Sequence, residues 1–313
     1  MGFIKKNNAS SFLIINSLLW GSSYVWSKML LGYMPRFTIL SLCALGGLIS
    51  TLILFRRSLK TINTYAIVAS IAVSIFSIIS NTFFMLALQY TSSSNTAFIV
   101  QLSVIITPIL MALAERKFPK GKVIVGAIIA ISGLFLMTCD LKTFSLNVGD
   151  LFALGNALFF SLFLTSLNYI SKKVDAVHFT FIHHLTNTFA FVTIAGFLEF
   201  SSINFNQFLT PIVAMLIVAC VGIAVVTVLL QSAAIRFVRP EKATLIYTLE
   251  PVTALILASL FIGERLNGVK SVTGCLLILL SVIITLYTPG ARQRSLFKKT
   301  KANSIMQGKP ILH

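Results

Sequence analysis

A carboxylate and a proline stand side by side in the apolar stretch LIYTLEPVTALIL, residues 245–257. Glu250 can bind a positively charged group or take up a proton, or it can be a neutral acid that only ties helices together by hydrogen bonds. Pro251 has no backbone N–H, and its ring crowds the carbonyl of Tyr247, so the sequence predicts a bend at this hinge. Tyr247 also shares the helical face of Glu250.

A second set of polar and aromatic residues recurs at helical spacing near the N-terminus. Asn16, Trp20, Tyr24 and Lys28 follow one another four residues apart, which places them on one face of a helix. We interpret Trp20 and Tyr24 as part of a cavity wall with Lys28 near its mouth. The alternative is a set of interfacial aromatic residues with a lysine that reaches the lipid headgroups.

Single polar residues interrupt other apolar stretches. Further candidates for the cavity lining are Asn81, Gln101 and Gln231, although each side chain can also serve only to hydrogen-bond to a neighbouring helix. Pro108 is a second candidate hinge. The adjacent histidines 183 and 184 are typical of an interfacial position near the membrane edge.

The motifs of several common enzyme classes are absent from the chain. It contains no G-x-x-x-x-G-K-[ST] phosphate loop, no G-x-S-x-G nucleophile elbow and no H-E-x-x-H pair. The four cysteines show no metal-ligand spacing and are interpreted as small packing residues. We therefore predict no catalytic residue, no metal and no cofactor.

The composition of the chain indicates whether these segments lie in water or in a lipid bilayer. The chain is 57% hydrophobic and 11% charged, against about 25% charged residues in a typical soluble domain. Stretches of about 20 apolar residues are long enough to cross a bilayer. We predict an all-α integral membrane protein with ten transmembrane helices, at residues 11–31, 36–55, 64–88, 92–114, 121–139, 150–171, 178–199, 210–235, 241–262 and 268–288.

The distribution of Lys and Arg gives this arrangement an orientation. The net charge of +17 can indicate nucleic-acid binding, but the cations stand in short clusters between apolar stretches, as in multispanning membrane proteins. With a cytoplasmic N-terminus, twenty cations fall inside and four outside, which places both termini in the cytoplasm. The inside set is Lys5, Lys6, Arg56, Arg57, Lys60, Arg116, Lys117, Lys120, Lys122, Lys172, Lys173, Arg236, Arg239, Lys242, Arg292, Arg294, Lys298, Lys299, Lys301 and Lys309, and the outside set is Arg36, Lys142, Arg265 and Lys270.

Two stretches of the chain resemble each other. Residues 87–117 and 233–266 align when the Glu-Arg pairs at 115–116 and 264–265 are matched, which pairs Gln101 with Glu250. The unit is five helices, an odd number, so the second half must be inverted relative to the first. Inverted repeats with a site near the bilayer midplane are typical of secondary transporters. The predicted organisation is a short N-terminus (1–10), two repeats (11–140 and 150–288) and a basic tail (289–313).

Three segments resemble the EamA family of the drug/metabolite transporter superfamily: WGSSYVWSK, ALQYTSSSNTAFIVQLSVIITPIL and PEKATLIYTLEPVTALILASLFIGERL. The resemblance implies two inverted five-helix halves around a central cavity lined mainly by helices 1, 3, 4, 6, 8 and 9. It also implies export of amino acids or other small metabolites. One departure is the segment VRPEKA at 238–243, which carries Arg239, Glu241 and Lys242 where small polar residues are common.

The sequence therefore predicts a secondary transporter that exports small metabolites by alternating access, with Glu250 as the candidate for proton coupling. The alternatives are an uptake permease for a nucleoside- or cofactor-like compound, and a membrane scaffold or intramembrane enzyme. A channel is disfavoured because no ring of like polar residues recurs from helix to helix. The predicted partners are a small-molecule substrate, the lipid bilayer and protons, with no nucleic acid, and the oligomeric state stays open. The expected location is the inner (plasma) membrane of a bacterium.

Overall fold

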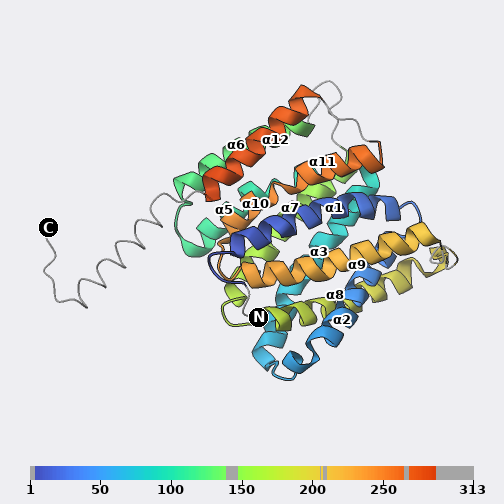
Figure 1. The fold of residues 1–313 in the computed structure, drawn as a ribbon. Helices are drawn as coiled ribbons and strands as arrows, with labels where there is room; N and C mark the ends of the chain where they lie inside the picture. Colours follow the sequence, from blue (N-terminus) through green and yellow to red (C-terminus); the bar gives the residue numbers. More distant parts are fainter. Residues whose placement is uncertain (1–3, 139–146, 205, 207–209, 264–267, 287–313) are drawn as a thin grey trace, which may run out of the picture.

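A computed structural model describes residues 4–138, 147–204, 206, 210–263 and 268–286, and its regular structure is entirely helical. Cys139, the cations at 142 and 265, both repeat ends near 140 and 288, and the tail 289–313 lie outside the described residues. The helices in Figure 1 are α1 (Ala9–Leu30), α2 (Arg36–Leu59), α3 (Thr64–Tyr90), α4 (Ser93–Val100), α5 (Ser103–Glu115), α6 (Gly121–Thr138), α7 (Val148–Ile170), α8 (Ala176–Leu198), α9 (Pro211–Ala234), α10 (Pro240–Tyr247), α11 (Glu250–Phe261) and α12 (Val269–Leu286), with a 3₁₀ turn at Phe200–Ser202.

Eight segments of the described chain are long and apolar enough to cross a membrane. Two of the ten predicted spans are not among them. The first is α1, whose polar stripe lowers its hydropathy, and the second is α6, whose apolar part at Gly121–Leu136 is short. The eight are Arg36–Leu59, Thr64–Tyr90, Ser93–Glu115, Val148–Ile170, Ala176–Leu198, Pro211–Ala234, Pro240–Phe261 and Val269–Leu286.

Polar side chains mark where several helices begin. Asn147 and Asp150 form a reciprocal capping box at the start of α7, and the Asp175 carboxylate accepts the Val177 N–H at the start of α8. Glu199, at the end of α8, accepts the backbone N–H groups of Phe37 and Thr38 at the start of α2 (3.1 and 2.8 Å). These carboxylates satisfy N–H groups that have no partner within their own helix.

Two of the predicted spans are each broken into a pair of short helices. Span 92–114 forms α4 and α5, with the break at Gln101–Leu102, and span 241–262 forms α10 and α11, with the break at Thr248–Leu249. At the first break Leu102 N–H donates to the Ile99 carbonyl, three residues back, at 3.0 Å. Such 3₁₀-type bonds tighten the chain at helix ends. Each predicted span is still one candidate membrane crossing, at Ser93–Glu115 and Pro240–Phe261, and the predicted bend in the second takes the form of a break directly before Glu250.

The breaks give a direct alignment of the two repeats. Matching them pairs Gln101 with Thr248 and Ser103 with Glu250. The predicted pairing of Gln101 with Glu250 is off by two residues, because it was fixed on the Glu-Arg pairs beyond the far ends of both broken segments. The residue equivalent to the Glu250 carboxylate is thus a serine hydroxyl.

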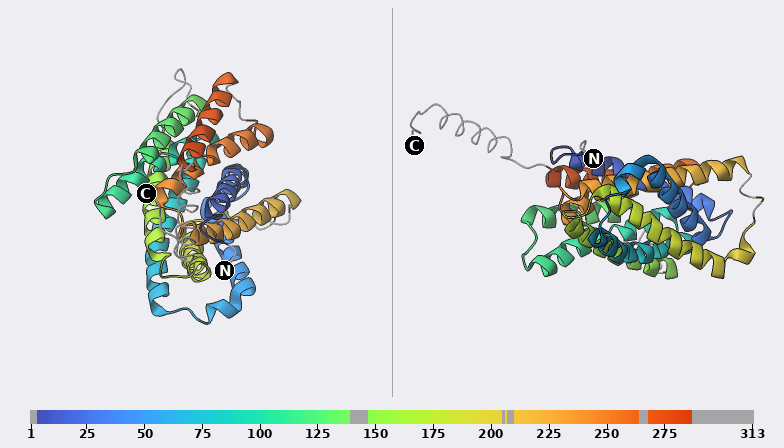
Figure 2. Two further views of the ribbon diagram at one scale, coloured as in Figure 1. Left: turned by 60° about the vertical axis from the view of Figure 1, so that its left-hand side comes forward. Right: turned by 90° about the horizontal axis from the view of Figure 1, so that it is seen from below.

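The helices pack in a pattern that is nearly unchanged when the two halves are exchanged. The packing of α3 on α7 matches that of α9 on α1, and α6 packs beside α12 as the last helices of their halves (Figures 1 and 2). Within the central pair, α10 packs on α5 and α11 packs on α4. The first half of each broken segment therefore lies against the second half of the other, so the two segments run antiparallel.

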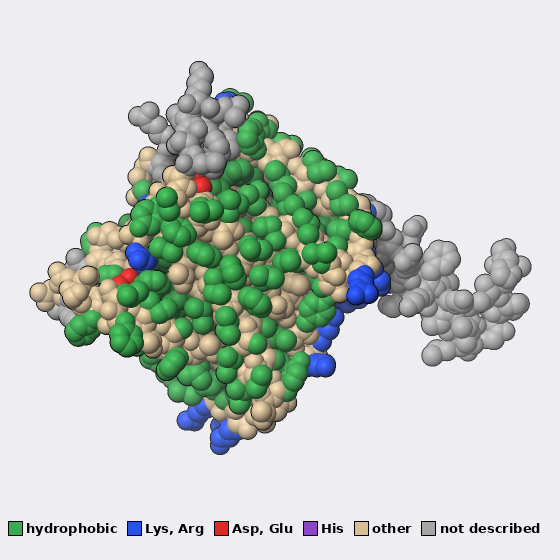
Figure 3. All heavy atoms as spheres, turned by 180° about the vertical axis from the view of Figure 1, so that it is seen from behind, with side chains coloured by type: hydrophobic (Ala, Val, Ile, Leu, Met, Phe, Trp, Pro, Cys, Tyr) green, Lys and Arg blue, Asp and Glu red, His purple; other side chains and the backbone are tan. Residues whose placement is uncertain are grey.

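The described cations gather at one end of the bundle, which we call the cationic end. It holds the start of α1 and the turns after α2, α5, α7 and α9, brought together by contacts such as Asn168 to Ile235 and His178 to Ser58. Figure 3 shows a broad hydrophobic face with most of the Lys and Arg in view along its lower and right-hand edges. Of the described cations, Arg36 and Lys270 lie at the opposite end, and Lys28 lies near it.

The largest hydrophobic cluster fills the part of the bundle next to the cationic end. It joins Ile4 before α1, Val174 after α7 and Val238 before α10 to the buried rings of Phe179 and Tyr247. Burial of large apolar side chains is the main favourable term that holds such a region closed. This cluster separates the cationic end from the middle of the bundle.

Candidate functional site

A cavity of about 190 Å³ lies at the centre of the bundle, between the two halves. Side chains from α1, α2, α3, α7, α8 and α9 line it, together with Val100 of α4 and Glu250 of α11. The resemblance implied a smaller role for the second and seventh helices, α2 and α8, which here supply a full wall. The polar lining residues are Ser23, Ser27, Ser77, Ser80, Asn81, Asn156, His183, His184, Asn187, Thr227, Gln231 and Glu250.

Glu250 is the first residue of α11, directly after the break in the second broken segment. The residue is 4% exposed, and its Oε2 atom accepts a hydrogen bond from the Tyr24 hydroxyl at 3.2 Å. Its Oε1 atom makes no hydrogen bond with the protein. A buried polar atom without a partner is costly, so it is a candidate contact for a ligand.

The backbone around the break is held by α1. Pro251 cannot donate to the Tyr247 carbonyl, and the Ser17 hydroxyl approaches the carbonyls of Ile246 and Tyr247 at 3.4 and 3.5 Å. One turn on, Gly21 packs so closely that a Cβ there would lie 2.6 Å from the Glu250 carbonyl oxygen. The position of the carboxylate thus depends on a close crossing of α1 and α11.

Two aromatic residues from equivalent positions face each other in the cavity. Trp20 of α1 and Phe160 of α7 meet edge to face with ring centroids 5.6 Å apart. Both rings also contact Tyr247, at 5.2 and 6.1 Å. Tyr24 packs edge to face on Phe84 of α3 at 4.9 Å. Trp20, Phe160 and Tyr247 thus form an aromatic surface next to the hydrophobic cluster of the cationic end, whereas Tyr24 and Phe84 lie in the cluster nearer the opposite end.

The adjacent histidines form part of the opposite wall. His183 and His184 are 4% and 3% exposed and line the cavity, so the prediction of an interfacial position is wrong. The His183 ring lies 3.2 Å from the Ser74 hydroxyl, and the His184 Nε2 atom has no partner in the protein. Gly47 of α2 makes room for the His184 ring, because a Cβ there would overlap it.

The predicted site residues fall into two groups. Trp20, Tyr24, Asn81, Gln231 and Glu250 line the cavity. Tyr247 is fully buried just behind the lining, and its hydroxyl accepts a hydrogen bond from Gln231 Nε2 at 3.2 Å.

Two predicted residues do not line the cavity. The Lys28 ammonium group donates to the backbone carbonyls of Leu88 and Thr91 at the end of α3. Gln101 is buried at the first helix break, away from the cavity lining.

The two candidate hinge prolines occupy different places. Pro251 is the second residue of α11 and follows its break directly, whereas Pro108 lies inside α5. The helix α5 continues through Pro108, and the first break stands several residues earlier at Gln101–Leu102.

The cysteines were predicted to be small packing residues with no further role. Cys43 of α2 and Cys220 of α9 both line the cavity, and their thiol groups are neighbours. Nothing in their spacing along the chain indicated this pairing, because it depends on how α2 crosses α9. Within the part of the chain that the structure describes, no three His, Cys, Asp or Glu side chains are placed to hold a metal ion.

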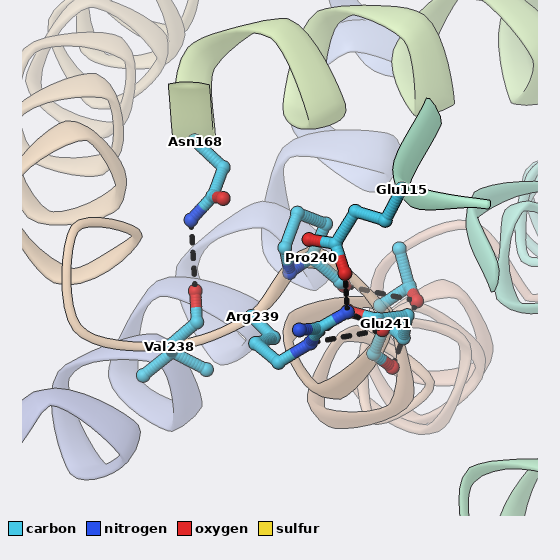
Figure 4. Close-up of polar contacts among 7 residues, drawn as sticks. Glu115, Asn168, Val238, Arg239, Pro240 and Glu241 are labelled. Atoms are coloured by element: carbon cyan, nitrogen blue, oxygen red, sulfur yellow. Dashed lines mark hydrogen bonds and ion pairs between the residues drawn. The ribbon is translucent and has the colours of Figure 1, made fainter. Parts of the chain in front are cut away.

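Charged residues of the segment VRPEKA, which departs from the family pattern, form an ion cluster at the cationic end (Figure 4). The Arg239 guanidinium donates to Glu241 at 2.8 Å and, across the bundle, to Glu115 at the end of α5 at 2.9 Å. These hydrogen bonds, that of Glu241 above all, raise the pKa of Arg239. Beside the cluster, Asn168 donates to the carbonyls of Ile235 and Val238 at 2.7 and 3.4 Å.

Comparisons with known proteins agree with this architecture. The sequence profile of the EamA-like transporter family matches residues 8–139 and, separately, residues 147–287. A relative from Archaeoglobus fulgidus, named an uncharacterized transporter, is 26% identical over 90% of this chain and 86% of its own length. A second relative of the same name, from Clostridium kluyveri, is 23% identical over 94% of this chain and 97% of its own.

A solved crystal structure shares the fold. It superposes with a TM-score of 0.72 at 15% sequence identity, and the match covers 89% of this chain and 98% of that one.

Proposed function

Because this chain belongs to the EamA-like transporter family, we propose that it exports amino acids or related small metabolites by alternating access. The observation that carries this proposal is the central cavity, which is bordered by both repeats and is lined by one of the described acidic residues, Glu250. Its volume of about 190 Å³ is below the roughly 300–1,000 Å³ of pockets for drug-sized ligands. A small metabolite fits this size.

The proposed membrane arrangement has ten spans in two inverted halves. It adds α1 and α6 to the eight apolar segments, because α1 packs along α9 and α11, and α6 packs along α12. The antiparallel packing of the two broken segments supports the inversion. The cationic end is placed in the cytoplasm of a bacterial cell by the positive-inside rule, with both termini on that side.

Alternating access requires that the cavity open to one side at a time. The hydrophobic cluster around Phe179 and Tyr247 separates the cavity from the cationic end, which supports assignment of this arrangement to a state closed toward the cytoplasm. The breaks at Gln101–Leu102 and Thr248–Leu249 supply joints at mid-height. A rocking of one half against the other bends the chain there, with Pro251 next to the second joint.

Glu250 is the proposed site of proton coupling, since a carboxyl group in the cavity can be reached from whichever side is open. The test uses proteoliposomes with a pH gradient and a loaded substrate. The wild-type protein is expected to drive accumulation, and Glu250→Gln to lose the gradient-driven part while retaining slow equilibration. Full gradient-driven transport by Glu250→Gln would show that protons couple elsewhere.

Direction and substrate are tested in cells and in vesicles made from them. Cells with and without the protein are compared for their excreted metabolites, and each difference is then assayed for export from inverted vesicles. Excretion of amino acids or their relatives supports the proposal. Concentrative uptake of nucleoside- or cofactor-like compounds, with no export, would replace it by the permease alternative.

A further inference from the structure

The acidic residues of the described chain have distinct tasks. Three of them cap helix starts: Asp150 caps α7, Asp175 caps α8 and Glu199 caps α2. Glu115 and Glu241 bind Arg239 at the cationic end. Glu250 is thus the described carboxylate that neither caps a helix nor pairs with a cation.

The surroundings of Glu250 contain no fixed positive charge. No Lys or Arg is among the described side chains that line the cavity, and Lys28 on the same helix as Tyr24 is bound to carbonyls at the end of α3. The Oε2 atom is held by Tyr24, and Oε1 has no partner in the protein. In a low-dielectric site, the attraction of such an oxygen for a cation is far stronger than in water.

Aromatic side chains line the same cavity as this carboxylate. Trp20, Tyr24, Phe84 and Phe160 line the cavity with it, and the negative face of an aromatic ring attracts a cation within about 6 Å. An ammonium group with three donors can bind Glu250 Oε1 and still face a ring. An anionic group at this place would meet a carboxylate and the ring faces, all of which repel it.

We propose that Glu250 Oε1 binds the primary ammonium group of the transported substrate, whose body lies among the cavity aromatics. This rests on the proposed function, since it names the chemical class of that function's substrate. Two sources supply this chemistry, free amines and amino acids. For an amino acid, the carboxylate end is held by neutral donors of the cavity such as Asn81 and Asn187, because the lining offers no guanidinium or ammonium group.

Binding can be measured without transport. The chain has two tryptophans, and Trp26 packs on Phe261 away from the cavity lining. Trp26→Phe therefore leaves Trp20 as a fluorescent reporter inside the cavity. The purified protein in detergent, with no gradient, is titrated with phenethylamine, phenylalanine and 2-phenylethanol, which share one ring and differ in charged groups.

Phenethylamine is expected to bind at least tenfold more tightly than 2-phenylethanol. Glu250→Gln is expected to reduce this preference to within twofold, and Glu250→Asp to restore part of it. The matched control Glu115→Gln removes a carboxylate at the cationic end and should leave all affinities unchanged. Comparable binding of phenylalanine identifies amino acids as the source of the ammonium group, whereas binding of phenethylamine alone identifies free amines.

Three results overturn the proposal: equal binding of the amine and the alcohol, an amine preference that persists in Glu250→Gln, or no amine binding by a wild-type protein that elutes and melts as a folded species. Each is separable from failure of the proposed function. A protein that binds the amine but moves nothing across proteoliposomes keeps the ammonium site and loses the transport assignment.

Discussion

Lys28 and Asn168 occupy equivalent positions in the two repeats and make equivalent hydrogen bonds. Each stands two residues before the end of the first helix of its half, α1 or α7. Lys28 binds the carbonyls of Leu88 and Thr91, and Asn168 binds those of Ile235 and Val238. In both halves these carbonyls lie five and two residues before the start of the broken segment at Ser93 or Pro240. One side chain therefore ties the first helix to the turn that precedes the broken segment.

The hydrogen bonds of Lys28 predict that its substitution lowers the stability of the fold. Lys28 is a cation near the C-terminal end of α3, where the helix dipole favours it, so Lys28→Ala should lower stability by about 1–3 kcal/mol. Lys28→Asn, which copies the other half, should recover most of that loss if the shorter side chain reaches the carbonyls. Thermal melting of the purified protein in detergent checks this. An unchanged melting temperature for Lys28→Ala would show that the tie contributes nothing.

Gly21→Ala is expected to impair the site more than the fold. The added methyl group would press on the Glu250 carbonyl and on Thr253, and separation of α1 from α11 would break the bond between Tyr24 and Glu250. Transport and amine binding should fall at least tenfold. Gly196→Ala, where a Cβ meets no other atom, is the matched control and should behave as wild type.

Removal of Arg239 should cost more than removal of Glu115. The bridge to Glu115 is partly exposed, and such pairs contribute about 0–1 kcal/mol. The Glu241 side chain, however, is only 5% exposed, and Arg239→Ala would leave its buried carboxylate without the hydrogen bonds from Arg239, at a cost of roughly 1–3 kcal/mol. The double variant Arg239→Ala/Glu241→Gln should regain stability. If it melts below Arg239→Ala, the cost has another origin.

Amine binding should weaken as the pH falls. Protonation of Glu250 removes the negative charge that attracts the ammonium group, and protonation of nearby histidines adds a repelling charge, so both effects have the same sign. In Glu250→Gln the remaining pH dependence should come from the histidines alone. Affinity that rises with acidity would contradict the assignment. The titratable side chains that share the cavity or border it are Tyr24, Cys43, His183, His184, Cys220 and Tyr247.

Much of the site was predicted from the lengths of the apolar stretches and from the single polar residues within them. Trp20, Tyr24 and Glu250 were expected in the cavity because polar or amphipathic side chains are costly toward lipid, and they lie there. The break before Pro251 also has a local cause, the missing N–H of proline. The break at Gln101 has no proline, so only the repeat could have suggested it.

Other features depended on tertiary packing. His183 and His184 looked interfacial from their position in the span, but Gly47 on a distant helix opens the space that takes the His184 ring inside. Lys28 looked free to reach a headgroup or a substrate, but the end of α3 presents carbonyls to it. In each case the residue type is known from the sequence, but the backbone segment that contacts the side chain is set by the packing of distant helices.

The contact between Gly47 and His184 has a mechanical consequence. Because the ring rests on bare backbone with no side chain in between, α2 and α8 cannot move closer together at this point. The cavity lining also includes Val100 and Glu250 of the two broken segments, where joints replace continuous hydrogen bonding. We therefore expect closure of the cavity around a smaller substrate to come from bending at these joints, because α2 and α8 cannot close further at Gly47 and His184.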